Sequence, residues 1–594
     1  MSHRLANYLA VGFLIFIFTI CLFSISNESL TMDELAHLPA GYSYLVKQDM
    51  RLNPEHPPLI KDLAGIPLLF IKGINFPEEI KPWQDDVNGQ WDFGNRFLFW
   101  SDNPADKMIF WARIPMILIL VIGGLYVFLF AKEFFGPKVG LLALFLYSFS
   151  PTLLAHGRLV TTDVGIAVGV LISFYYFLRA LREPTKKNIF FAGIGFGLAL
   201  LLKFTAVFLM PCFIFLTVFW AILKGLEAKE KKGKIILDYA LMLFSIFFIA
   251  GLFLWPVYAF HVLKYPPERQ ARDIEFVLSS HPVQLIEKIL PPLAYSALLR
   301  PYAQYLYGLA MVFQRGVGGN TTYFMGEISA SGWKTYFPVI YLIKETLVFH
   351  LLTGLAVLSS LWLLLKEFLK KGGLNGFSQK FIALCHNYFP EISLSSFIVL
   401  YWGLTLASNL NIGVRHLIPV IPLTMILVAR FVIKNLLKEP YLKVRYGLLA
   451  VLLLWQAVSV VSVYPHFIAY FNELIGGSKN GYLYAADSNL DWGQDVKRLK
   501  KWVDEQGIDK IYMDVFGGTD ARYYFKEKFR QWCGTCNPND LEKGSYLAVS
   551  ATFFDGGRGQ PVSGFTEDYG YYHWLDNQEL VTTIGHSIFV YRIK

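Results

Sequence analysis

The sequence predicts a polytopic α-helical membrane protein that ends in a small α/β domain. Of its 594 residues, 54% are hydrophobic and only 17% are charged, whereas an ordinary soluble domain carries about 25% charged residues. Many apolar runs reach the roughly 17–25 residues that cross a hydrocarbon core. After residue 463 the chain becomes more polar and strand-like, which indicates a separate domain outside the bilayer.

We expect about eleven membrane spans, each an apolar helix. The first apolar run follows His3 and Arg4 and could be taken for a signal peptide, but it is longer than a signal core and lacks a small-x-small cleavage site, which favours an uncleaved span. The expected spans cover residues 6–26, 109–131, 138–156, 162–180, 188–202, 204–223, 235–260, 338–365, 392–410, 417–435 and 446–463.

Basic residues occur mainly in every second predicted loop, which orients the chain with its N-terminus in the cytoplasm. The short outer turns contain only Arg158, Lys203 and Arg415. Because the net charge of +9 is scattered over helix ends rather than collected on one face, nucleic-acid binding is disfavoured. The inner loops contain Lys132, Lys138, Arg179, Arg182, Lys186, Lys187, Lys224, Lys229, Lys231, Lys232, Lys234, Lys366, Lys370, Lys371, Lys380, Lys434, Lys438, Lys443 and Arg445.

This topology divides the chain into a membrane domain, residues 1–463, and an outer domain, residues 464–594, called the tail below. Two large loops of the membrane domain, residues 27–108 and 261–337, face the same side as the tail. The tail is long enough for a small α/β domain with its own core. Strands are expected at Lys510–Phe516, Ser545–Phe554 and Ser587–Arg592, and a helix between Gln494 and Gln506.

Polar residues from distant parts of the sequence fall at the outer ends of these spans. A single charge near a span can be an anchor that reaches the interface, whereas several charges of both signs at one level indicate a shared, water-accessible cavity. The residues concerned are Asp33, Glu34, His37, Asn53, Glu55, His56, Asp163, Lys203, Arg415 and His416.

These side chains could support acid–base chemistry on a phosphate-linked substrate. If the segment after Ser29 is helical, Asp33 and His37 share a face, and a carboxylate there could accept a proton from an attacking hydroxyl. Lys203 and Arg415, with or without a divalent metal ion, could stabilise charge on a leaving phosphate. Plainer uses stay open: a helix cap for the acidic pair, and interfacial anchoring for the two cations.

Five motifs, in order, resemble the protein O-mannosyltransferase-like family. The first outer loop contains Asp33-Glu34-x-x-His37 and Arg51-Leu-Asn-Pro-Glu-His-Pro-Pro-Leu59. Further matches are Thr161-Thr162-Asp163, Leu202-Lys203-Phe204-Thr205, Tyr323–Lys344 and Asn411-x-Gly413-x-Arg415-His416. The resemblance covers about residues 1–465 and includes the related lipid A aminoarabinose transferases, which carry lysine where this chain has His56.

The resemblance implies a GT-C membrane fold and an inverting glycosyltransferase, mannosyltransferase-like, in a bacterial cytoplasmic membrane. Its donor would be a polyprenyl-phosphate-linked sugar, and its acceptor a hydroxyl of a protein, lipid or glycan. The catalytic carboxylates would be Asp33, as the base, and Glu34 beside it. Asn53, Glu55, His56, Asp163, Lys203, Arg415 and His416 would contact substrate, and Glu55 with His37 would hold any metal ion.

The tail also carries the segment Asp487-Ser-Asn-Leu-Asp-Trp-Gly-Gln-Asp495, which resembles the outer domain of a bacterial subgroup. The side-chain oxygens of Asp487, Asn489, Asp491 and Asp495 are spaced similarly to those of a calcium-binding loop. However, Trp492 and Arg498 occupy the positions where such loops need glycine and glutamate. A helix cap at Asp491 or a sugar contact at Trp492 are alternatives. Cys533 and Cys536 would form a small disulfide clip or a redox pair in an outward domain.

Two other classes of function are compatible with charges near spans. A transporter or flippase of a lipid-linked substrate would show internal repeats and interrupted spans at mid-membrane, and no such repeat is visible. A receptor-like relative that binds glycan without catalysis would not need to keep Asp33, Glu55, Lys203 and Arg415 together.

Overall fold

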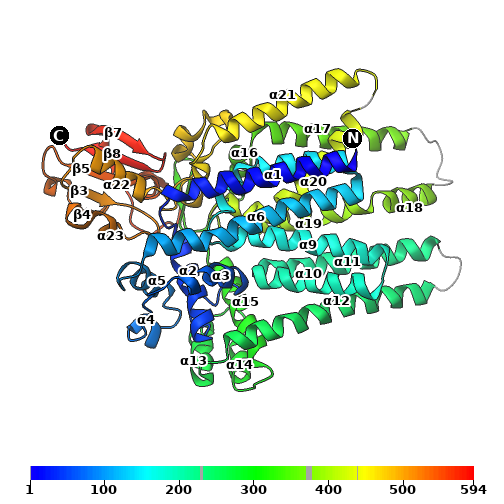
Figure 1. The fold of residues 1–594 in the computed structure, drawn as a ribbon, viewed down its shortest axis with the longest axis horizontal. Helices are drawn as coiled ribbons and strands as arrows, with labels where there is room; N and C mark the ends of the chain where they lie inside the picture. Colours follow the sequence, from blue (N-terminus) through cyan, green and yellow to red (C-terminus); the bar gives the residue numbers. More distant parts are fainter. Residues whose placement is uncertain (1, 228–231, 370–376, 438) are drawn as a thin grey trace.

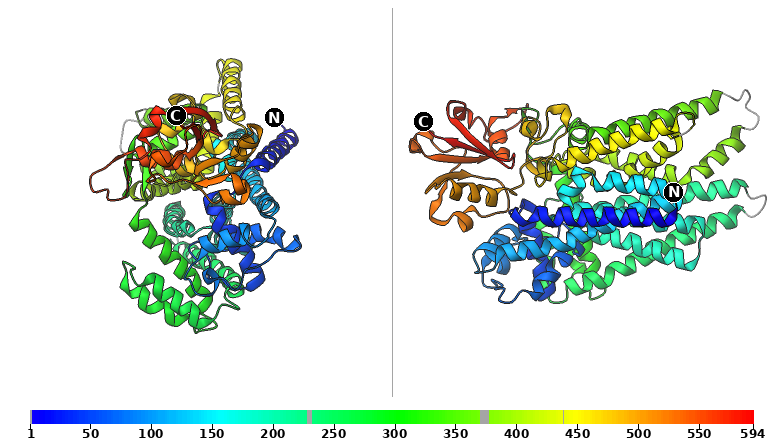
Figure 2. Two further views of the ribbon diagram at one scale, coloured as in Figure 1. Left: turned by 90° about the vertical axis from the view of Figure 1, so that its left-hand side faces the viewer. Right: turned by 45° about the horizontal axis from the view of Figure 1, so that its top comes forward.

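The computed structural model describes residues 2–227, 232–369, 377–437 and 439–594. Long helices run side by side and form an elongated bundle, and the two large loops and the tail gather at one end of it (Figure 1). We call this end the outer end, after the side on which the sequence predicts the loops and the tail. The N-terminus lies toward the opposite end from the C-terminus (Figures 1 and 2). Lys229, Lys231, Lys370, Lys371 and Lys438 of the charge argument lie outside the described residues.

Within the described residues, eight helical segments are long and apolar enough to cross a membrane, and a ninth span results if α16 (Tyr336–Lys344) and α17 (Leu347–Leu369), bent by 114°, form one span. The predicted helical membrane class is thus confirmed, but not the count of eleven. Two further expected spans are helices of 12 and 17 residues, α7 (Pro137–Ser148) and α10 (Lys186–Leu202). The eight segments are His3–Asn27, Ala105–Phe135, Thr162–Arg182, Phe204–Leu226, Lys232–His261, Phe389–Ala407, Val414–Leu436 and Leu442–Val461.

These segments contain α1 (His3–Ser24), α6 (Ala105–Phe135), α9 (Thr162–Arg182), α11 (Leu209–Glu227), α12 (Lys232–His261), α19 (Phe389–Ala407), α20 (Ile421–Phe431) and α21 (Leu442–Val461). Helix α9 is the central one: 89% of its most apolar stretch is buried inside the protein, against 11% for α21, which lies at the periphery of the bundle. Because α9 packs against α6 and α10, its first turn is held in the middle of the outer end.

Two short helical regions connect to the spans at this outer end. The first loop folds into α2 (Met32–Lys47), α3 (Leu59–Gly65), α4 (Lys81–Gln84) and α5 (Gln90–Phe99). The second contains α13 (Pro267–Leu278), α14 (Gln284–Leu293), α15 (Arg300–Gly318), β1 (Thr322–Phe324) and β2 (Glu327–Ser329). Two short turns matter for the site: η3 (Phe204–Phe208) precedes α11, and η4 (Val414–Val420) precedes α20. Helices α8 (Pro151–His156) and α18 (Phe377–Asn387) complete the membrane domain.

The tail is the expected small α/β unit. Its sheet has the strand order β4-β3-β5-β8-β7, with β3 parallel to β4 and β5, and β8 antiparallel to both of its neighbours. The predicted strands and helix are confirmed at β3 (Ile511–Asp514), β5 (Tyr546–Ser550), β8 (Ile588–Arg592) and α22 (Val496–Glu505). The other elements are α23 (Ala521–Phe525), α24 (Ala551–Arg558), β4 (Phe529–Gln531), β6 (Gln560–Pro561) and β7 (Glu579–Ile584).

Several contacts join the tail to the outer loops. Strand β6 pairs in parallel with β2, and the apolar core of the tail continues through Phe324 and Tyr336 into the second loop. Cys533 and Cys536 are joined by a disulfide next to β4. The tail is therefore packed against the membrane domain rather than tethered to it by a flexible linker.

Candidate active site

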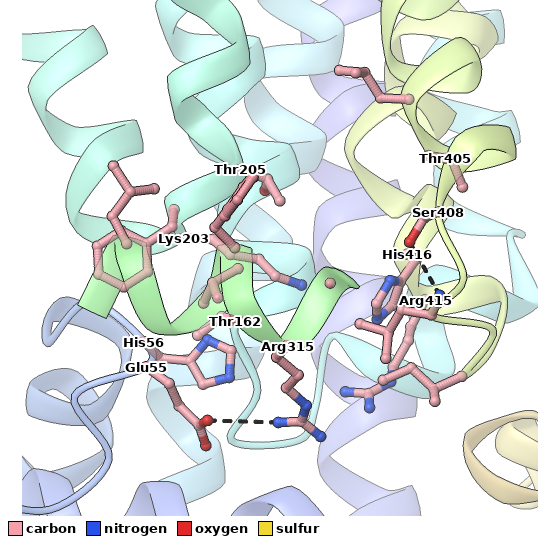
Figure 3. Close-up of a pocket in the computed structure, with 18 of the residues that line it drawn as sticks. Glu55, His56, Thr162, Lys203, Thr205, Arg315, Thr405, Ser408, Arg415 and His416 are labelled. Atoms are coloured by element: carbon pink, nitrogen blue, oxygen red, sulfur yellow. Dashed lines mark hydrogen bonds and ion pairs between the residues drawn. The ribbon is translucent and has the colours of Figure 1, made fainter. Parts of the chain in front are cut away.

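A cavity of about 440 Å³ opens at the outer end, between the helix bundle and the two loops. Its wall has two parts. One part is polar and contains most of the side chains singled out from the sequence, and the other is apolar and is built from η3, α15 and α19 (Figure 3). The polar part consists of Asp33, His37, Asn53, Glu55, His56, Thr162, Lys203, Arg315, Arg415 and His416.

Acids and bases alternate across the polar part. Arg415 of η4 donates from Nη1 to Asp33 Oδ2 at 2.6 Å and lies 3.5 Å from Asp163 Oδ2. Lys203 donates from Nζ to the other oxygen of Asp163 at 2.5 Å. Side chains from three separate elements, α2, α9 and η4, thus form one network of ion pairs. The sequence predicted that these charges would lie together. Asp163 itself is buried and does not line the cavity; it reaches the cavity only through its two cations.

Asp33 lies in the first turn of α2 and keeps 21% of its side chain exposed to the cavity. Burial by itself would raise the pKa of this carboxyl, but the charge and the hydrogen bond of Arg415 outweigh that effect and hold the pKa below its usual value. The carboxylate is therefore ionised at neutral pH and can accept a proton or a hydrogen bond from a hydroxyl group.

Arg415 depends on the glycine before Val414. Gly413 has φ of +122°, and a Cβ at this position would come within 2.3 Å of the Ser488 hydroxyl, so that a larger residue would push the turn away from the tail. The guanidinium of Arg415 lies over the ring of Trp492, 4.5 Å from its centre. Its Nε is buried and makes no hydrogen bond among the described residues, which leaves a donor available to a ligand.

His37 and His56 pack edge to face, with ring centres 5.0 Å apart. His37 Nδ1 is 2.8 Å from the carbonyl oxygen of Val160, and His56 Nδ1 is buried without a partner in the described structure. Burial lowers the pKa of both rings, and neighbouring cations lower that of His56 further. Both imidazoles are thus neutral at pH 7 and serve as hydrogen-bonding groups rather than cations.

Sequence reasoning missed Arg315 as a site residue. It lies in the last turn of α15, in the glycine-rich run Arg315-Gly-Val-Gly-Gly319. Its guanidinium is 3.6 Å from Glu55 Oε2 and points into the cavity (Figure 3). The other Glu55 oxygen accepts from Gln90 Nε2 at 2.9 Å. The signal was present, because a lone arginine beside several glycines in an outer loop can approach an anion closely.

Lys61 was also missed as an organiser of the first loop. Its buried Nζ donates to the carbonyl oxygens of Asn53 and His56 at 2.7 and 2.8 Å, and to Asn53 Oδ1 at 2.9 Å. The amide of Asn53 also donates to Gln90. Although Asn53 lines the cavity, its polar atoms are engaged in holding the loop, which makes it a support for Glu55 and His56.

Glu34 requires a correction, because its position does not fit the predicted catalytic role. The side chain is fully buried and does not line the cavity. It accepts from Arg113 Nε and Nη2 at 2.8 and 2.6 Å, from the Thr31 N–H at 2.9 Å, and from the Val160 N–H at 3.0 Å. Glu34 caps α2 and fixes it to α6, and its neighbour Asp33 alone faces the cavity.

The expected metal site was tested on the donors present. In the described parts of the chain, no three His, Cys, Asp or Glu side chains gather in an arrangement that could hold a metal ion. Glu55 is engaged by Gln90 and Arg315, and His37 by Val160. The pair Glu55 and His37 therefore does not form a metal site by itself, and no step below is routed through a metal ion.

The fold and the cavity define a multi-pass membrane protein with a charged site at one end of its helices. A family model described as dolichyl-phosphate-mannose-protein mannosyltransferase matches residues 105–255. This segment carries Asp163 and Lys203, and over it the resemblance inferred from the motifs is confirmed. A search of curated proteins gives no match.

Several solved structures are similar to this chain. ArnT from Cupriavidus metallidurans bound to undecaprenyl phosphate is 11% identical, with a TM-score of 0.43 over 98% of this chain and 97% of that chain. The apo Archaeoglobus fulgidus oligosaccharyltransferase is 12% identical, with a TM-score of 0.49 over 94% and 72%. The donor-bound S. cerevisiae protein O-mannosyltransferase Pmt1–Pmt2 complex is 16% identical, with a TM-score of 0.35 over 44% and 34%. This chain spans about a third of the length of that yeast chain.

Proposed function

We propose that this protein is a membrane glycosyltransferase that moves a monosaccharide from a polyprenyl-phosphate donor to a hydroxyl acceptor. The observation that carries the proposal is that one cavity joins a carboxylate and several cations to an apolar wall. A lipid-linked sugar phosphate has the same division, with an anionic head and a hydrocarbon chain. The match to a family described by its dolichyl-phosphate-mannose donor supports the same reading.

The apolar wall suits the hydrocarbon part of the donor. Val207 and Phe208 come from η3, Leu309 and Val312 from α15, and Leu404 from α19. These elements adjoin spans that are only partly buried inside the protein, so in a bilayer a polyprenyl chain could enter from the side and bury its apolar surface without leaving a hydrophobic environment. The phosphate would then reach the polar wall beside the first residues of η3.

The polar wall suits transfer in a single displacement. Lys203, Arg315 and Arg415 would bind the phosphate oxygens and stabilise the negative charge that develops on the phosphate as the glycosidic bond breaks. Asp33 would accept the proton of the acceptor hydroxyl while the hydroxyl oxygen attacks the anomeric carbon from the opposite face. One displacement of this kind inverts the anomeric configuration.

Arg415 links the two halves of this mechanism. In the structure described here it is paired with Asp33, which keeps the carboxylate ionised but weakly basic. A donor phosphate within reach of the guanidinium would compete with Asp33 for it, and the carboxylate would become a stronger base as the donor settles. Asp33 would thus be most basic when a donor is in place.

The finer assignments belong to the same proposal. In this proposal the resemblance suggests a mannose-like donor sugar, a protein, lipid or glycan hydroxyl as acceptor, and a bacterial cytoplasmic membrane as the location. The basic loops would face the cytoplasm, and the cavity and tail the outside. A flippase is the alternative, but the charged residues that line the cavity come from one end of the bundle.

The test uses purified full-length protein in lipid nanodiscs with a panel of polyprenyl-phosphate sugars and of peptide, lipid and glycan acceptors. Mass spectrometry would detect donor cleavage and the mass added to an acceptor. We expect one donor to be consumed and its sugar to appear on an acceptor, and Asp33→Asn to prevent this. Movement of an intact donor between leaflets of a proteoliposome without cleavage would instead identify a flippase.

A further inference from the structure

The tail segment Asp487–Asp495 lies directly behind the charged wall of the cavity. We propose that this segment, which we call the tail clamp, sets the relative position of Asp33 and Arg415, and that Trp492 is a positioning residue for Arg415. The inference rests on the proposed function in one respect, namely that the Asp33–Arg415 pair takes part in catalysis. The contacts that carry it are independent of the identity of the sugar.

Trp492 is the part of the tail clamp that touches Arg415. The indole is only 1% exposed, although it comes from the tail and not from the membrane domain. Its ring lies 4.5 Å from the guanidinium carbon of Arg415 and 5.7 Å from the ring of His156, in an edge-to-face contact. A cation over an indole is attracted most strongly when both are withdrawn from water, so this contact fixes the guanidinium where it meets Asp33.

The backbone of the tail clamp also holds the start of α2, which carries Asp33. The Met32 N–H donates to the Trp492 carbonyl at 3.0 Å, and the Ser29 N–H donates to the Gln494 carbonyl at 2.9 Å. A second stretch of the tail supports the same point, because Gly518 lies so near the Thr31 carbonyl that a Cβ would be 2.4 Å from its oxygen. Met32, directly before Asp33, is thus hydrogen-bonded to Trp492, whose ring contacts Arg415.

The other end of the tail clamp holds the turn that carries Arg415. Asn489 Oδ1 accepts from the Val414 N–H at 2.9 Å, and the Ser488 hydroxyl donates to the Ile412 carbonyl at 2.5 Å. The Asn489 carbonyl accepts in turn from the buried Nζ of Lys344 at 2.6 Å. One stretch of the tail therefore binds both elements of the Asp33–Arg415 pair.

The alternative roles of this segment do not fit its contacts. As a calcium loop it would need open carboxylates, but Asp491 accepts from the Thr552 N–H at 3.0 Å and Asp495 from the Ser587 hydroxyl at 2.6 Å. As a sugar-binding surface it would need an accessible indole, and Trp492 is buried. Positioning the cavity wall is the use that its hydrogen bonds support.

The first experiment measures binding of undecaprenyl phosphate to the purified full-length protein and three variants. Trp492→Met keeps an apolar side chain without an aromatic face, and Trp492→Phe keeps a face. Trp532→Met replaces another buried tail tryptophan, whose ring packs edge to face on Tyr512 of β3. We expect about tenfold weaker binding for Trp492→Met and a change of less than about threefold for the other two. Equal affinities for Trp492→Met and wild type would overturn the inference.

A second measurement does not depend on the proposed function. Hydrogen exchange without added lipid reports on the amides of Met32 and Val414, which are bonded to the tail clamp. Trp492→Met should speed exchange at both amides, and Trp532→Met at neither. If wild type neither binds undecaprenyl phosphate nor turns over a donor, the proposed function fails, but the exchange data still decide the positioning role. Unchanged exchange in Trp492→Met would refute it.

The pH dependence of turnover separates positioning from general damage. The groups that face Asp33 are Arg415 from η4, His37 from α2, Asp163 from α9 and Asp487 from the tail. Displacing Arg415 removes the largest stabilising charge, so the acidic limb of kcat/KM should move to higher pH in Trp492→Met and return toward wild type in Trp492→Phe. A fall in rate with an unshifted limb would count against positioning.

If Trp492→Met does not fold, Ser488→Ala provides the test. This change removes one hydroxyl that joins the tail clamp to the Ile412 carbonyl and leaves Trp492 in place. We expect two- to fivefold weaker binding of undecaprenyl phosphate, because the turn carrying Arg415 loses one of its supports. Wild-type affinity together with wild-type exchange at Val414 would overturn the inference.

Discussion

Two networks of acids and bases lie next to each other at the outer end of the bundle, and they differ in access to solvent. The cavity network, Asp33, Arg415, Asp163 and Lys203, lines or adjoins an open space, and Asp33 keeps 21% of its side chain exposed. The sealed network joins Glu34 to Arg113, with both side chains fully buried. Both networks pair carboxylates with cationic side chains, so burial and hydrogen-bond satisfaction decide which carboxylate can take part in chemistry.

The adjacent acids Asp33 and Glu34 make the contrast sharp. Successive residues of a helix point about 100° apart, and in α2 this turns one carboxylate to the cavity and the other to Arg113. Glu34 already accepts four hydrogen bonds from backbone and guanidinium donors. A carboxylate whose lone pairs are occupied in this way stabilises structure and has little capacity left for a substrate.

Asp33→Asn should produce the largest effect on activity. The amide cannot accept the hydroxyl proton, so kcat should fall by about 10²–10⁴-fold, while the melting temperature stays near that of wild type. Mass-spectrometric turnover and differential scanning fluorimetry on the same sample check both parts. Turnover within threefold of wild type would remove Asp33 from the role of base.

Glu34→Gln should produce the opposite pattern, a loss of stability. Breaking a buried ion pair leaves an uncompensated charge on Arg113 and costs about 3–5 kcal/mol. The control is Glu78→Gln, which breaks the exposed pair with Lys47 and should change stability by less than about 1 kcal/mol. Thermal unfolding in one detergent compares the two, and similar melting temperatures would contradict the assignment of Glu34 to the sealed network.

Lys203→Ala should weaken donor binding more than it slows chemistry. One of three cations near the phosphate site is removed, and the affinity for undecaprenyl phosphate should fall about tenfold or more. Lys501→Ala, on an exposed face of α22, is the matched loss of charge. A titration of each variant with undecaprenyl phosphate measures the difference, and equal affinities would show that Lys203 serves only Asp163.

The smallest effect is expected at Asp487, on the tail side of the cavity. Burial raises the pKa of Asp487 from 3.8 to about 6, against the attraction of Arg415. A raised carboxyl pKa means that the folded protein holds this proton more tightly than the unfolded chain, so stability is lost as the pH rises through about 6. Asp487→Asn removes that loss.

The Asn variant should therefore be more stable than wild type at pH 7.5, by about 1 kcal/mol after solvent screening, and no more stable at about pH 3, below the unfolded pKa of 3.8. Thermal unfolding at both values checks the sign. A gain of the same size at both would show that Asp487 does not titrate in this range.

Much of the membrane domain could be predicted because its signals are local. Apolar runs, loop charges and the tail periodicity depend only on neighbours in sequence, and they located α1, α9, α22 and β8. Asp33, Lys203 and Arg415 were found because charges at the ends of spans are unusual in any membrane protein.

Other parts of the site depend on contacts that a sequence does not display. The separation of Asp33 from Glu34 follows from Arg113, which lies 79 residues further on. The burial of Trp492 follows from docking of the tail, and Lys61 acts through backbone carbonyls that any sequence would offer. Short or bent helices such as α7 and α16 also lack the uninterrupted length on which a span count relies.

The strand order of the tail bears on how the protein is made. Asp495 of the tail clamp is held by Ser587, immediately before β8, and β8 lies between β5 and β7 inside the sheet. Helix α2 is synthesised early, yet its first turn is hydrogen-bonded to the tail clamp. The tail clamp can make all of its contacts only after β8 has been synthesised. A chain truncated before residue 587 would contain every span and every cavity residue. It would lack the Ser587 hydroxyl that donates to Asp495, and it would lack strand β8. Termination before Ser587 should therefore abolish activity while the protein stays in the membrane.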